Sequence, residues 1–182
     1  ITGTSIDLSW RTKNTPYAMM TFHRPSNVDE EDTLSILVEE WLKTAELMPI
    51  IFPIHPRTLD KLNQFKLFSR LTSSSNIFLT GPLGYLDFLK LVSESALVIT
   101  DSGGIQEETT YLKIPCLTVR PTTERPITIW AGSNQLVLPE DIFIKSKQIA
   151  EISKTDYEVP KYWEGQAATR IINMLETYGT GQ

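Results

Sequence analysis

Short runs of consecutive apolar residues alternate along this chain with amphipathic stretches of helical spacing. The apolar runs are rich in Ile, Leu and Val and do not alternate with polar residues, so they predict strands that are covered on both faces. We expect six such strands, over residues 17–22, 49–54, 76–80, 96–100, 115–119 and 134–138. Strands and helices that follow one another in this way predict right-handed βαβ units, and therefore a doubly wound parallel α/β sheet.

The stretches between the strands predict helices over residues 31–47, 58–68, 85–93, 105–112, 146–152 and 164–178. In the first of these, apolar residues recur at spacings of three and four and form one stripe. Three acidic residues fall outside that stripe: Glu30, Glu39 and Glu40. The 182 residues suffice for a two-sided core, so we expect one domain over 1–182, with residues 1–15 as a lead-in.

Composition limits the partners that this chain can have. Its 17 Lys and Arg against 22 Asp and Glu give a net charge of -5, so no overall positive field attracts nucleic acid. The single Cys116 excludes an intrachain disulfide, and one thiol with two histidines cannot fill a Cys-rich zinc site. No apolar run is long enough to cross a bilayer, and the first residues given lack the charged and hydrophobic regions of a signal peptide. We therefore expect a cytoplasmic protein without nucleic-acid, membrane or metal partners.

Parallel sheets bind ligands beyond the carboxyl ends of their strands, so the residues after each strand are candidates for a site. His23 and Arg24 follow the first strand, and His55 follows the second. A guanidinium offers phosphate a fork of N–H donors, and an imidazole beside it can donate to a leaving oxygen or carry a proton. The alternative for His23 is a loop histidine bonded to the backbone. For His55 the alternative is stronger, because His55, Pro56 and Arg57 can simply shape a turn from strand to helix.

The most informative segment is Asp-Ser-Gly-Gly-Ile-Gln-Glu-Glu at 101–108. It follows a buried strand, its glycines allow a tight turn, and a helix is expected from about residue 105. The unpaired N–H groups and the positive dipole end of that helix favour an anion, so Ser102, Gly103 and Gly104 are the predicted phosphate seat. Glu108, one turn further on, can accept two ribose hydroxyls.

An alternative interpretation of the same segment assigns it no ligand. Asp101 or Ser102 is then an ordinary N-cap, and the glutamates Glu107 and Glu108 balance the helix dipole. The segment has neither a third glycine nor Gly-Lys-Ser/Thr, which disfavours a dinucleotide dehydrogenase and an NTPase.

The loop after the fifth strand reads Thr-Thr-Glu-Arg-Pro at 122–126. Its Arg125 is a second candidate phosphate clamp, held by the proline that follows. Phe88, in the helix after the third strand, can face a flat base, although a core position is the commoner role for an aromatic side chain. Three residues nearby are secondary candidates for the site: His55, Glu107 and Glu124.

Together these motifs resemble those of UDP-N-acetylglucosamine 2-epimerases. The resemblance runs from about residue 17 to about residue 178 and includes Pro82-Leu83-Gly84-Tyr85 as well as the motifs above. Members of the family have a two-domain glycosyltransferase-B architecture, so the resemblance implies that this chain is the second, Rossmann-like half, which holds the nucleotide. By position, it implies a diphosphate on Ser102, Gly103, Gly104 and Arg125, the ribose on Glu108, uracil near Phe88, and the reacting sugar near His23 and Arg24.

The resemblance also implies an activity, the interconversion of UDP-GlcNAc and UDP-ManNAc. In this chemistry UDP leaves C1 as the C2 proton is removed, and UDP adds back to the 2-acetamidoglucal after reprotonation on the other face. The reaction requires no NAD, metal or other cofactor. Because the first half of family members supplies the acidic groups for proton transfer, we expect this chain alone to bind without turnover. We also expect the helix at 164–178 to pack on that other half, and the full-length protein to be a homodimer.

Two departures from the family pattern bear on this implication. The chain has Pro25 and Ser26 where family members often have Arg and Glu, and Ile127 where they commonly have Glu. These changes concern an activator site and the choice of substrate more than the nucleotide seat. The alternatives are a hydrolysing epimerase, a glycosyltransferase of the same architecture, and a non-catalytic module that binds sugar nucleotides.

Overall fold

The computed structural model describes residues 15–152 and 156–179, and its core is a six-stranded sheet in which every pair of neighbouring strands is parallel. The strand order is β3-β2-β1-β4-β5-β6, the order of a doubly wound, Rossmann-like sheet. The expected strands are confirmed, with ends that differ by at most one residue: β1 (Ala18–Thr21), β2 (Ile50–Pro53), β3 (Ile77–Thr80), β4 (Leu97–Thr100), β5 (Cys116–Val119) and β6 (Asn134–Val137).

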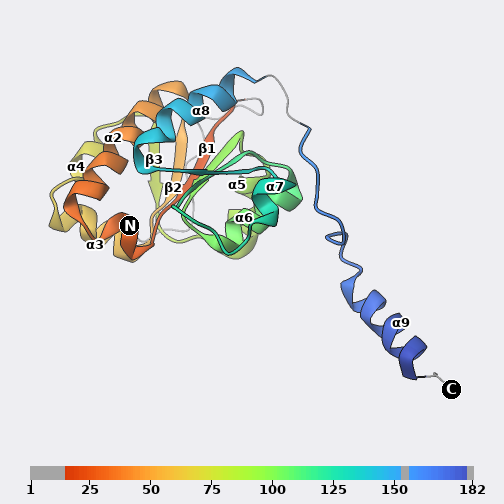
Figure 1. Ribbon diagram of the computed structural model, residues 1–182. Helices are drawn as coiled ribbons and strands as arrows, with labels where there is room; N and C mark the ends of the chain where they lie inside the picture. The colour runs from red at the N-terminus through yellow and green to blue at the C-terminus, as the bar shows by residue number, and fades with distance from the viewer. Residues whose placement is uncertain (1–14, 153–155, 180–182) are drawn as a thin grey trace.

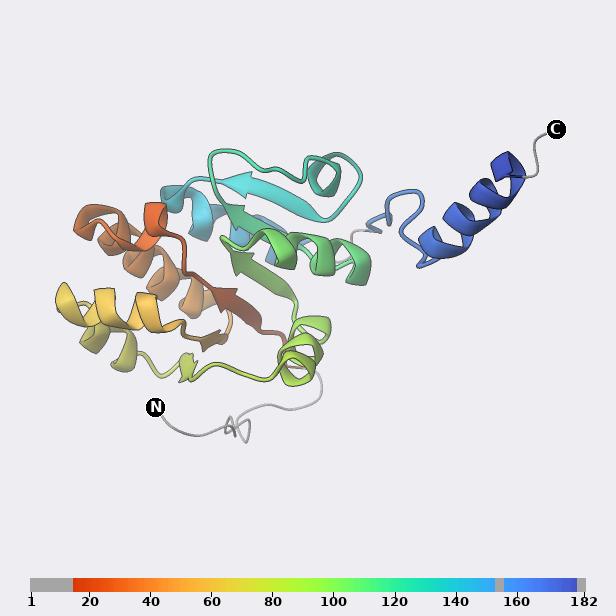
Figure 2. The ribbon, with the colours of Figure 1, turned by 90° about the horizontal axis from the view of Figure 1, so that it is seen from below.

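Helices cover both faces of this sheet, as Figures 1 and 2 show. One face carries α2 (Glu31–Leu47), α3 (Pro56–Gln64), α4 (Phe68–Thr72) and α8 (Ile142–Glu151), and the other carries α5 (Tyr85–Ser93) and α6 (Gly103–Leu112). Side chains of β1 alternate between the two layers, because Met20 packs with Trp41 of α2 whereas Met19 packs with Leu91 of α5. Since both layers are buried, the strands need apolar residues in consecutive positions.

Several helix boundaries differ from those expected. The single helix expected at 58–68 is divided into α3 and α4, because Lys66 has a left-handed φ of 57° that an α-helix does not tolerate. The expected helix at 146–152 is α8, which begins four residues earlier, and the final helix is α9 (Ala167–Gly179). Three short helices occupy stretches for which no helix is expected from the sequence: α1 (Pro25–Val28), α7 (Ile127–Trp130) and the 3₁₀ helix η1 (Pro139–Asp141).

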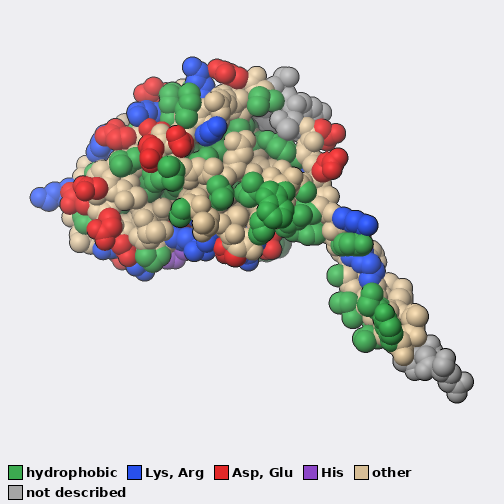
Figure 3. Space-filling view, in the orientation of Figure 1, with side chains coloured by type: hydrophobic (Ala, Val, Ile, Leu, Met, Phe, Trp, Pro, Cys, Tyr) green, Lys and Arg blue, Asp and Glu red, His purple; other side chains and the backbone are tan. Residues whose placement is uncertain are grey.

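The final helix, α9, extends away from the sheet (Figures 1 and 3). Its large apolar side chains are all more than half exposed: Ile171, Ile172, Met174, Leu175 and Tyr178. An apolar stripe of this kind is typical of a surface that packs on another element. Most of the expected lead-in, residues 1–14, lies outside the described residues. No helix in the described part of the chain has the length and apolar character needed to cross a membrane.

Glu40 of α2 is buried, which the spacing of apolar residues in this helix does not predict. The spacing places it outside the apolar stripe, yet the residue is only 5% exposed. Its Oε2 accepts a 2.9 Å hydrogen bond from the backbone N–H of Phe143 at the start of α8, and its Oε1 pairs with Lys43 Nζ at 2.7 Å. The carboxylate thus satisfies a first-turn amide of α8 and joins the two helices.

This contact predicts unequal roles for two neighbouring glutamates. Glu40→Ala should lower the free energy of unfolding by about 2 kcal/mol, because it leaves a half-buried amide of α8 without its acceptor. Glu39→Ala is the matched control, since Glu39 pairs with Arg70 at the surface and such pairs contribute less than about 1 kcal/mol. Urea unfolding of both variants measures the difference, and equal losses would contradict the role of Glu40.

Candidate functional site

The two central strands, β1 and β4, end side by side at the point where the strand order reverses. Thr21 and Thr100 are the last residues in register, and their hydroxyl oxygens lie 2.9 Å apart. After these residues the chain continues to α2 on one face of the sheet and to α6 on the other. Doubly wound sheets bind their ligands at such a switch point.

Asp101 follows β4 and ties the ends of these strands together. It is fully buried, and its Oδ2 accepts hydrogen bonds from the backbone N–H groups of His23 and Arg24, at 3.1 Å and 2.9 Å. The side-chain amide of Asn27 donates to the same oxygen at 3.2 Å. In return, Arg24 Nε donates to the carbonyl oxygen of Asp101 at 2.9 Å. The loop after β1 is therefore held against the end of β4.

The carboxyl group of Asp101 stays ionised in this setting. Burial raises its pKa, but the hydrogen bonds from His23, Arg24 and Asn27 outweigh burial and hold the pKa below its usual value. The sequence analysis considered Asp101 only as an N-cap and missed this role. The position of Asp101, directly after a buried central strand and opposite a polar loop, is the sequence feature that could have indicated this role.

His23 and His55 face each other across one pocket. Nδ1 of His23 lies 3.2 Å from Oδ1 of Asp101, and the two imidazole ring centroids are 5.5 Å apart. Nδ1 of His55 accepts a hydrogen bond from the backbone N–H of Arg57 and caps α3, as the alternative for His55 predicted. The pocket has a volume of about 200 Å³, and its lining includes His23, His55, Phe88, Ser102 and Ile105.

The amino end of α6 borders this pocket and is open. Ser102 is the N-cap residue, but its side chain makes no capping bond, and the carboxylate of Asp101 faces the loop after β1. Ser102 thus holds the N-cap position that the alternative gave it, but neither Ser102 nor Asp101 makes the side-chain capping bond. The Ser102 N–H donates to Thr100 Oγ1 at 3.0 Å. No described residue accepts a hydrogen bond from the backbone N–H of Gly103 or Gly104, so neither amide has a partner within the described chain; Gly104 is exposed, whereas Gly103 is buried.

The two glycines form the first turn of α6 instead of the separate turn expected before residue 105. Neither has a positive φ, so the backbone conformation does not require glycine at either position. A Cβ on Gly103 would lie 2.7 Å from Arg125 Nη1 and 2.9 Å from Glu124 Oε1, whereas a Cβ on Gly104 would meet no atom within 4 Å. Gly103 thus makes room for two charged side chains, and Gly104 leaves open space at the start of the helix.

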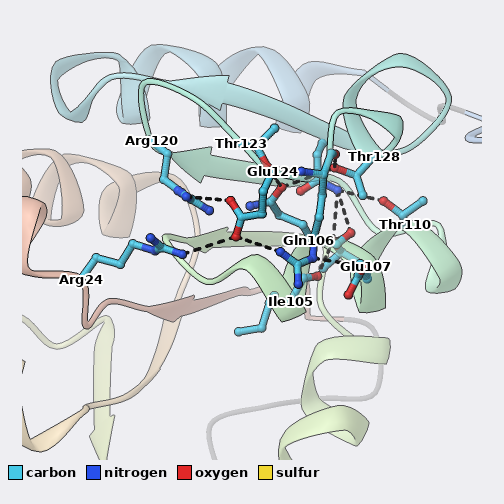
Figure 4. A network of polar contacts seen from close by, with 12 residues as sticks. Arg24, Ile105, Gln106, Glu107, Thr110, Arg120, Thr123, Glu124 and Thr128 are labelled. Carbon is cyan, nitrogen blue, oxygen red and sulfur yellow. Dashed lines mark hydrogen bonds and ion pairs between the residues drawn. The ribbon is translucent and has the colours of Figure 1, made fainter.

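Three guanidinium groups converge on Glu124 (Figure 4). Arg120 Nη2 and Arg125 Nη1 each lie 2.8 Å from a Glu124 carboxylate oxygen, and Arg24 Nη2 lies at 3.6 Å. The hydrogen bond from Arg120 is the main cause that lowers the pKa of Glu124 to about 2. Arg125 Nε also pairs with Glu107 at 3.1 Å. Positive charge is therefore gathered beside the amino end of α6 and partly balanced by carboxylates.

Arg120 is a site residue that the sequence analysis did not single out. Its side chain is only 13% exposed, and its Nη1 is buried without a hydrogen-bond partner in the described part of the chain. Its position, directly after the fifth strand and on the same rim as Arg24, is the signal that could have identified it. A buried guanidinium nitrogen with unused donors favours an anionic ligand nearby.

A buried polar network holds the loop at 120–126 against α6. Oε1 of Gln106, a fully buried residue, accepts a 2.7 Å hydrogen bond from Thr123 Oγ1, and Asn134 Nδ2 donates to the Gln106 carbonyl oxygen at 3.0 Å. Thr123 Oγ1 in turn accepts from the backbone N–H of Arg125 at 3.0 Å. Arg125 is thus positioned through residues that are themselves buried or half-buried.

The remaining predicted residues lie around this seat. Phe88 is half-buried, so it lines the pocket and also packs on the smaller core cluster. Glu108 lies beside Tyr85 of α5, and its pKa is raised. Burial is the largest cause of this rise, and the negative charge of Glu107 raises the pKa further, whereas the hydrogen bond with Tyr85 lowers it. The structure therefore brings His23, His55, Phe88 and Ser102 to one pocket, and Arg24, Arg125, Glu107 and Glu124 to the adjacent seat.

The site shows no arrangement suited to a metal ion. Among the described residues, no three His, Cys, Asp or Glu side chains lie close enough together to hold one. Cys116 is buried in β5, where burial raises its pKa to about 12, so the thiol is held away from this chemistry.

Comparison with known proteins identifies a family. The profile of the family described as UDP-N-acetylglucosamine 2-epimerase matches residues 3–176. The protein of that name from Methanococcus maripaludis is 46% identical over 168 residues, which are 90% of this chain and 45% of the relative. The protein of that name from Methanocaldococcus jannaschii is 42% identical over 166 residues, again 90% of this chain and 45% of the relative.

A solved structure gives the same match. The crystal structure of the Methanocaldococcus jannaschii UDP-GlcNAc 2-epimerase in complex with UDP-GlcNAc and UDP has a TM-score of 0.79 and 41% identity, over 91% of this chain and 46% of that one. This chain thus spans about half the length of the relatives that it matches. Its fold is a Rossmann-like half of a glycosyltransferase-B-type architecture.

The cluster around Glu124 predicts a specific acid sensitivity. Because the folded-state pKa of Glu124, about 2, lies below its ordinary value of 4.5, its ion pairs stabilise the fold above pH 4.5 and lose that effect as the pH falls toward 2. Glu124→Gln should therefore flatten the dependence of unfolding free energy on pH in this window. Glu46→Gln, at an exposed position of α2, is the control. Equal slopes for wild type and Glu124→Gln in urea unfolding would show that the cluster is not formed.

Proposed function

Because this chain belongs to the UDP-N-acetylglucosamine 2-epimerase family, we propose that it is the half of such an enzyme that binds UDP within UDP-GlcNAc and UDP-ManNAc. The observation that carries this proposal is the open amino end of α6, where Gly103 and Gly104 present free amides beside Arg120 and Arg125. A diphosphate has the charge and the acceptor oxygens that suit this arrangement.

The other groups of the nucleotide have candidate partners within reach of this seat. Glu108, one turn along α6, accepts the two ribose hydroxyls, and its partly buried setting strengthens such hydrogen bonds. Phe88 at the rim of the pocket offers an apolar face to uracil. The bound diphosphate shares Arg24, Arg120 and Arg125 with Glu124, whose carboxylate already draws them together.

We propose that the seat also serves the chemistry of the whole enzyme. The C2 proton of the sugar has no adjacent carbonyl to acidify it, so cleavage of the bond between C1 and oxygen must lead. Stabilisation of the departing UDP is then the largest task for the protein. The amides of α6, Arg125 and His23 are suited to that task, whereas the groups that remove and return the C2 proton come from the other half. On its own, this chain binds without turnover.

The exposed apolar face of α9 is consistent with a full-length protein that has a second half. The apolar side chains of α9 are exposed and extend away from the sheet (Figure 3), and the relatives are about twice as long as this chain. We propose that α9 packs on the other half in a full-length protein, where its apolar face is covered.

Isothermal titration of the chain with UDP and with inorganic diphosphate tests the proposal. UDP should bind, and Glu108→Ala should weaken UDP by about tenfold or more while it changes the diphosphate affinity less than about twofold, because only UDP carries the ribose. Glu151→Ala, at an exposed position at the end of α8, is the control. The proposal fails if the wild-type chain gives no heat with UDP at millimolar concentration.

A second prediction separates stability from binding at the two glycines. Gly104→Ala should raise the free energy of unfolding by about 0.5–1 kcal/mol, since the helix gains a better residue in open space. It should also weaken UDP binding by about tenfold, because the added methyl group occupies the place of a phosphate. Gly103→Ala should weaken binding without this gain, since its Cβ displaces Arg125 and Glu124. Unchanged UDP affinity in Gly104→Ala would place the ligand elsewhere.

A further inference from the structure

The geometry points to Asp101 as a positioning residue: we propose that it fixes His23 in the tautomer that carries its proton on Nδ1 and so aims an unprotonated Nε2 at the pocket. Only the role of His23 toward a bound diphosphate rests on the proposed function. The tautomer itself follows from contacts within the chain.

The first step is the contact between the two side chains. Nδ1 of His23 lies 3.2 Å from Oδ1 of Asp101, and the aspartate is fully buried. An ionised carboxylate can only accept hydrogen bonds, so the nitrogen that faces it must carry the proton. The tautomer of a histidine is set by the hydrogen bond that one of its ring nitrogens makes.

The second step is that Asp101 cannot turn away. Its other oxygen accepts from the backbone N–H of Arg24 and from Asn27 Nδ2, and the backbone N–H of His23 donates to both oxygens. The carboxylate therefore holds the main chain and the imidazole of the same residue at once. Rotation of the carboxylate would break its hydrogen bonds with these buried and part-buried donors, which costs free energy.

His55 provides an opposite case within the same pocket. Its Nδ1 accepts a hydrogen bond from the backbone N–H of Arg57, so a neutral His55 carries its proton on Nε2. The two rings are 5.5 Å apart and line one pocket. Among the described residues, the titratable groups with a contact to the His23 ring are Asp101 and His55, and Arg24 is its neighbour in the sequence.

This tautomer decides what His23 can do toward a ligand. With Nδ1–H held by Asp101, a neutral His23 presents the lone pair of Nε2 to the pocket, and a protonated one presents an N–H donor there. His23 can therefore donate to an oxygen of a departing diphosphate through Nε2 while its other nitrogen stays fixed, which is the arrangement that general acids use.

Nuclear magnetic resonance of the ¹⁵N-labelled chain tests the inference directly. The chain has two histidines, so a long-range ¹H–¹⁵N correlation at about pH 9, where imidazoles are ordinarily neutral, contains two ring patterns. We expect one Nδ1–H and one Nε2–H pattern. His55→Asn keeps a residue that caps helices well and should remove only the Nε2–H pattern. Two Nε2–H patterns in the wild-type chain would overturn the inference.

The variant Asp101→Asn tests whether the carboxylate of Asp101 sets the tautomer of His23. The amide oxygen of this variant can replace Oδ2 and accept from the backbone N–H of Arg24, which leaves the NH2 group facing Nδ1 of His23. Nδ1 must then accept a hydrogen bond, so His23 should change to the Nε2–H tautomer, and UDP affinity should fall by about tenfold. Asn27→Ala removes a different partner of Asp101 and should leave the tautomer of His23 unchanged. A Nδ1–H pattern that persists in a folded Asp101→Asn variant contradicts the inference, and if this variant does not fold, the wild-type spectrum decides.

The two claims can fail separately. If the wild-type chain shows the expected tautomers but does not bind UDP, the proposed function is wrong and the positioning of His23 stands. If it binds UDP but shows two Nε2–H patterns, the positioning is wrong and the nucleotide seat stands.

Discussion

The buried carboxylate of Asp101 is the constraint on which the rest of the site depends. It joins the end of β4 to the loop after β1 through His23, Arg24 and Asn27, which lie 74 to 78 residues away in the sequence. Because its oxygens are used in this way, Asp101 does not cap α6, and the first amides of that helix stay open. One side chain thus holds together the chain segments that follow the two central strands and leaves the start of α6 without a side-chain cap.

Charge explains how an acidic chain can hold such a seat. The net charge of -5 is unfavourable for a nucleotide, but Arg24, Arg120 and Arg125 meet at one rim. Glu124 and Glu107 pair with these arginines and reduce the repulsion among them. A bound diphosphate therefore enters a site whose donors already point inward, which lowers the cost of ordering them. Gly103 permits this arrangement because a side chain there would displace Arg125 and Glu124.

The strands could be predicted from the sequence because both faces of the sheet are buried, so each strand appears as a run of consecutive apolar residues. The rim of the sheet could be predicted as well, because His23, His55 and Ser102 directly follow strands and line one pocket. The ends of the helices were harder to predict from the sequence. The break at Lys66 depends on one left-handed residue, and the start of α6 depends on where Asp101 points, which distant partners decide.

The contacts of Glu40 and Arg120 could not be predicted from the sequence for a related reason. Periodicity along α2 indicates which face meets the sheet, but it does not show that α8 lies across Glu40. Local spacing likewise cannot show that Arg120 and Arg24 meet at Glu124. Each contact joins elements that are distant in the sequence, so it exists only after the sheet has formed.

The central claim is that a diphosphate lies on the open amides of α6, and amide chemical shifts report on it directly. Titration of the ¹⁵N-labelled chain with UDP should move the backbone N–H resonances of Gly103 and Gly104 downfield, as expected for amides that gain a charged acceptor. Inorganic diphosphate should move the same two resonances. If UDP binds and leaves both amides unmoved while other resonances shift, the nucleotide lies elsewhere and this account of the site is wrong.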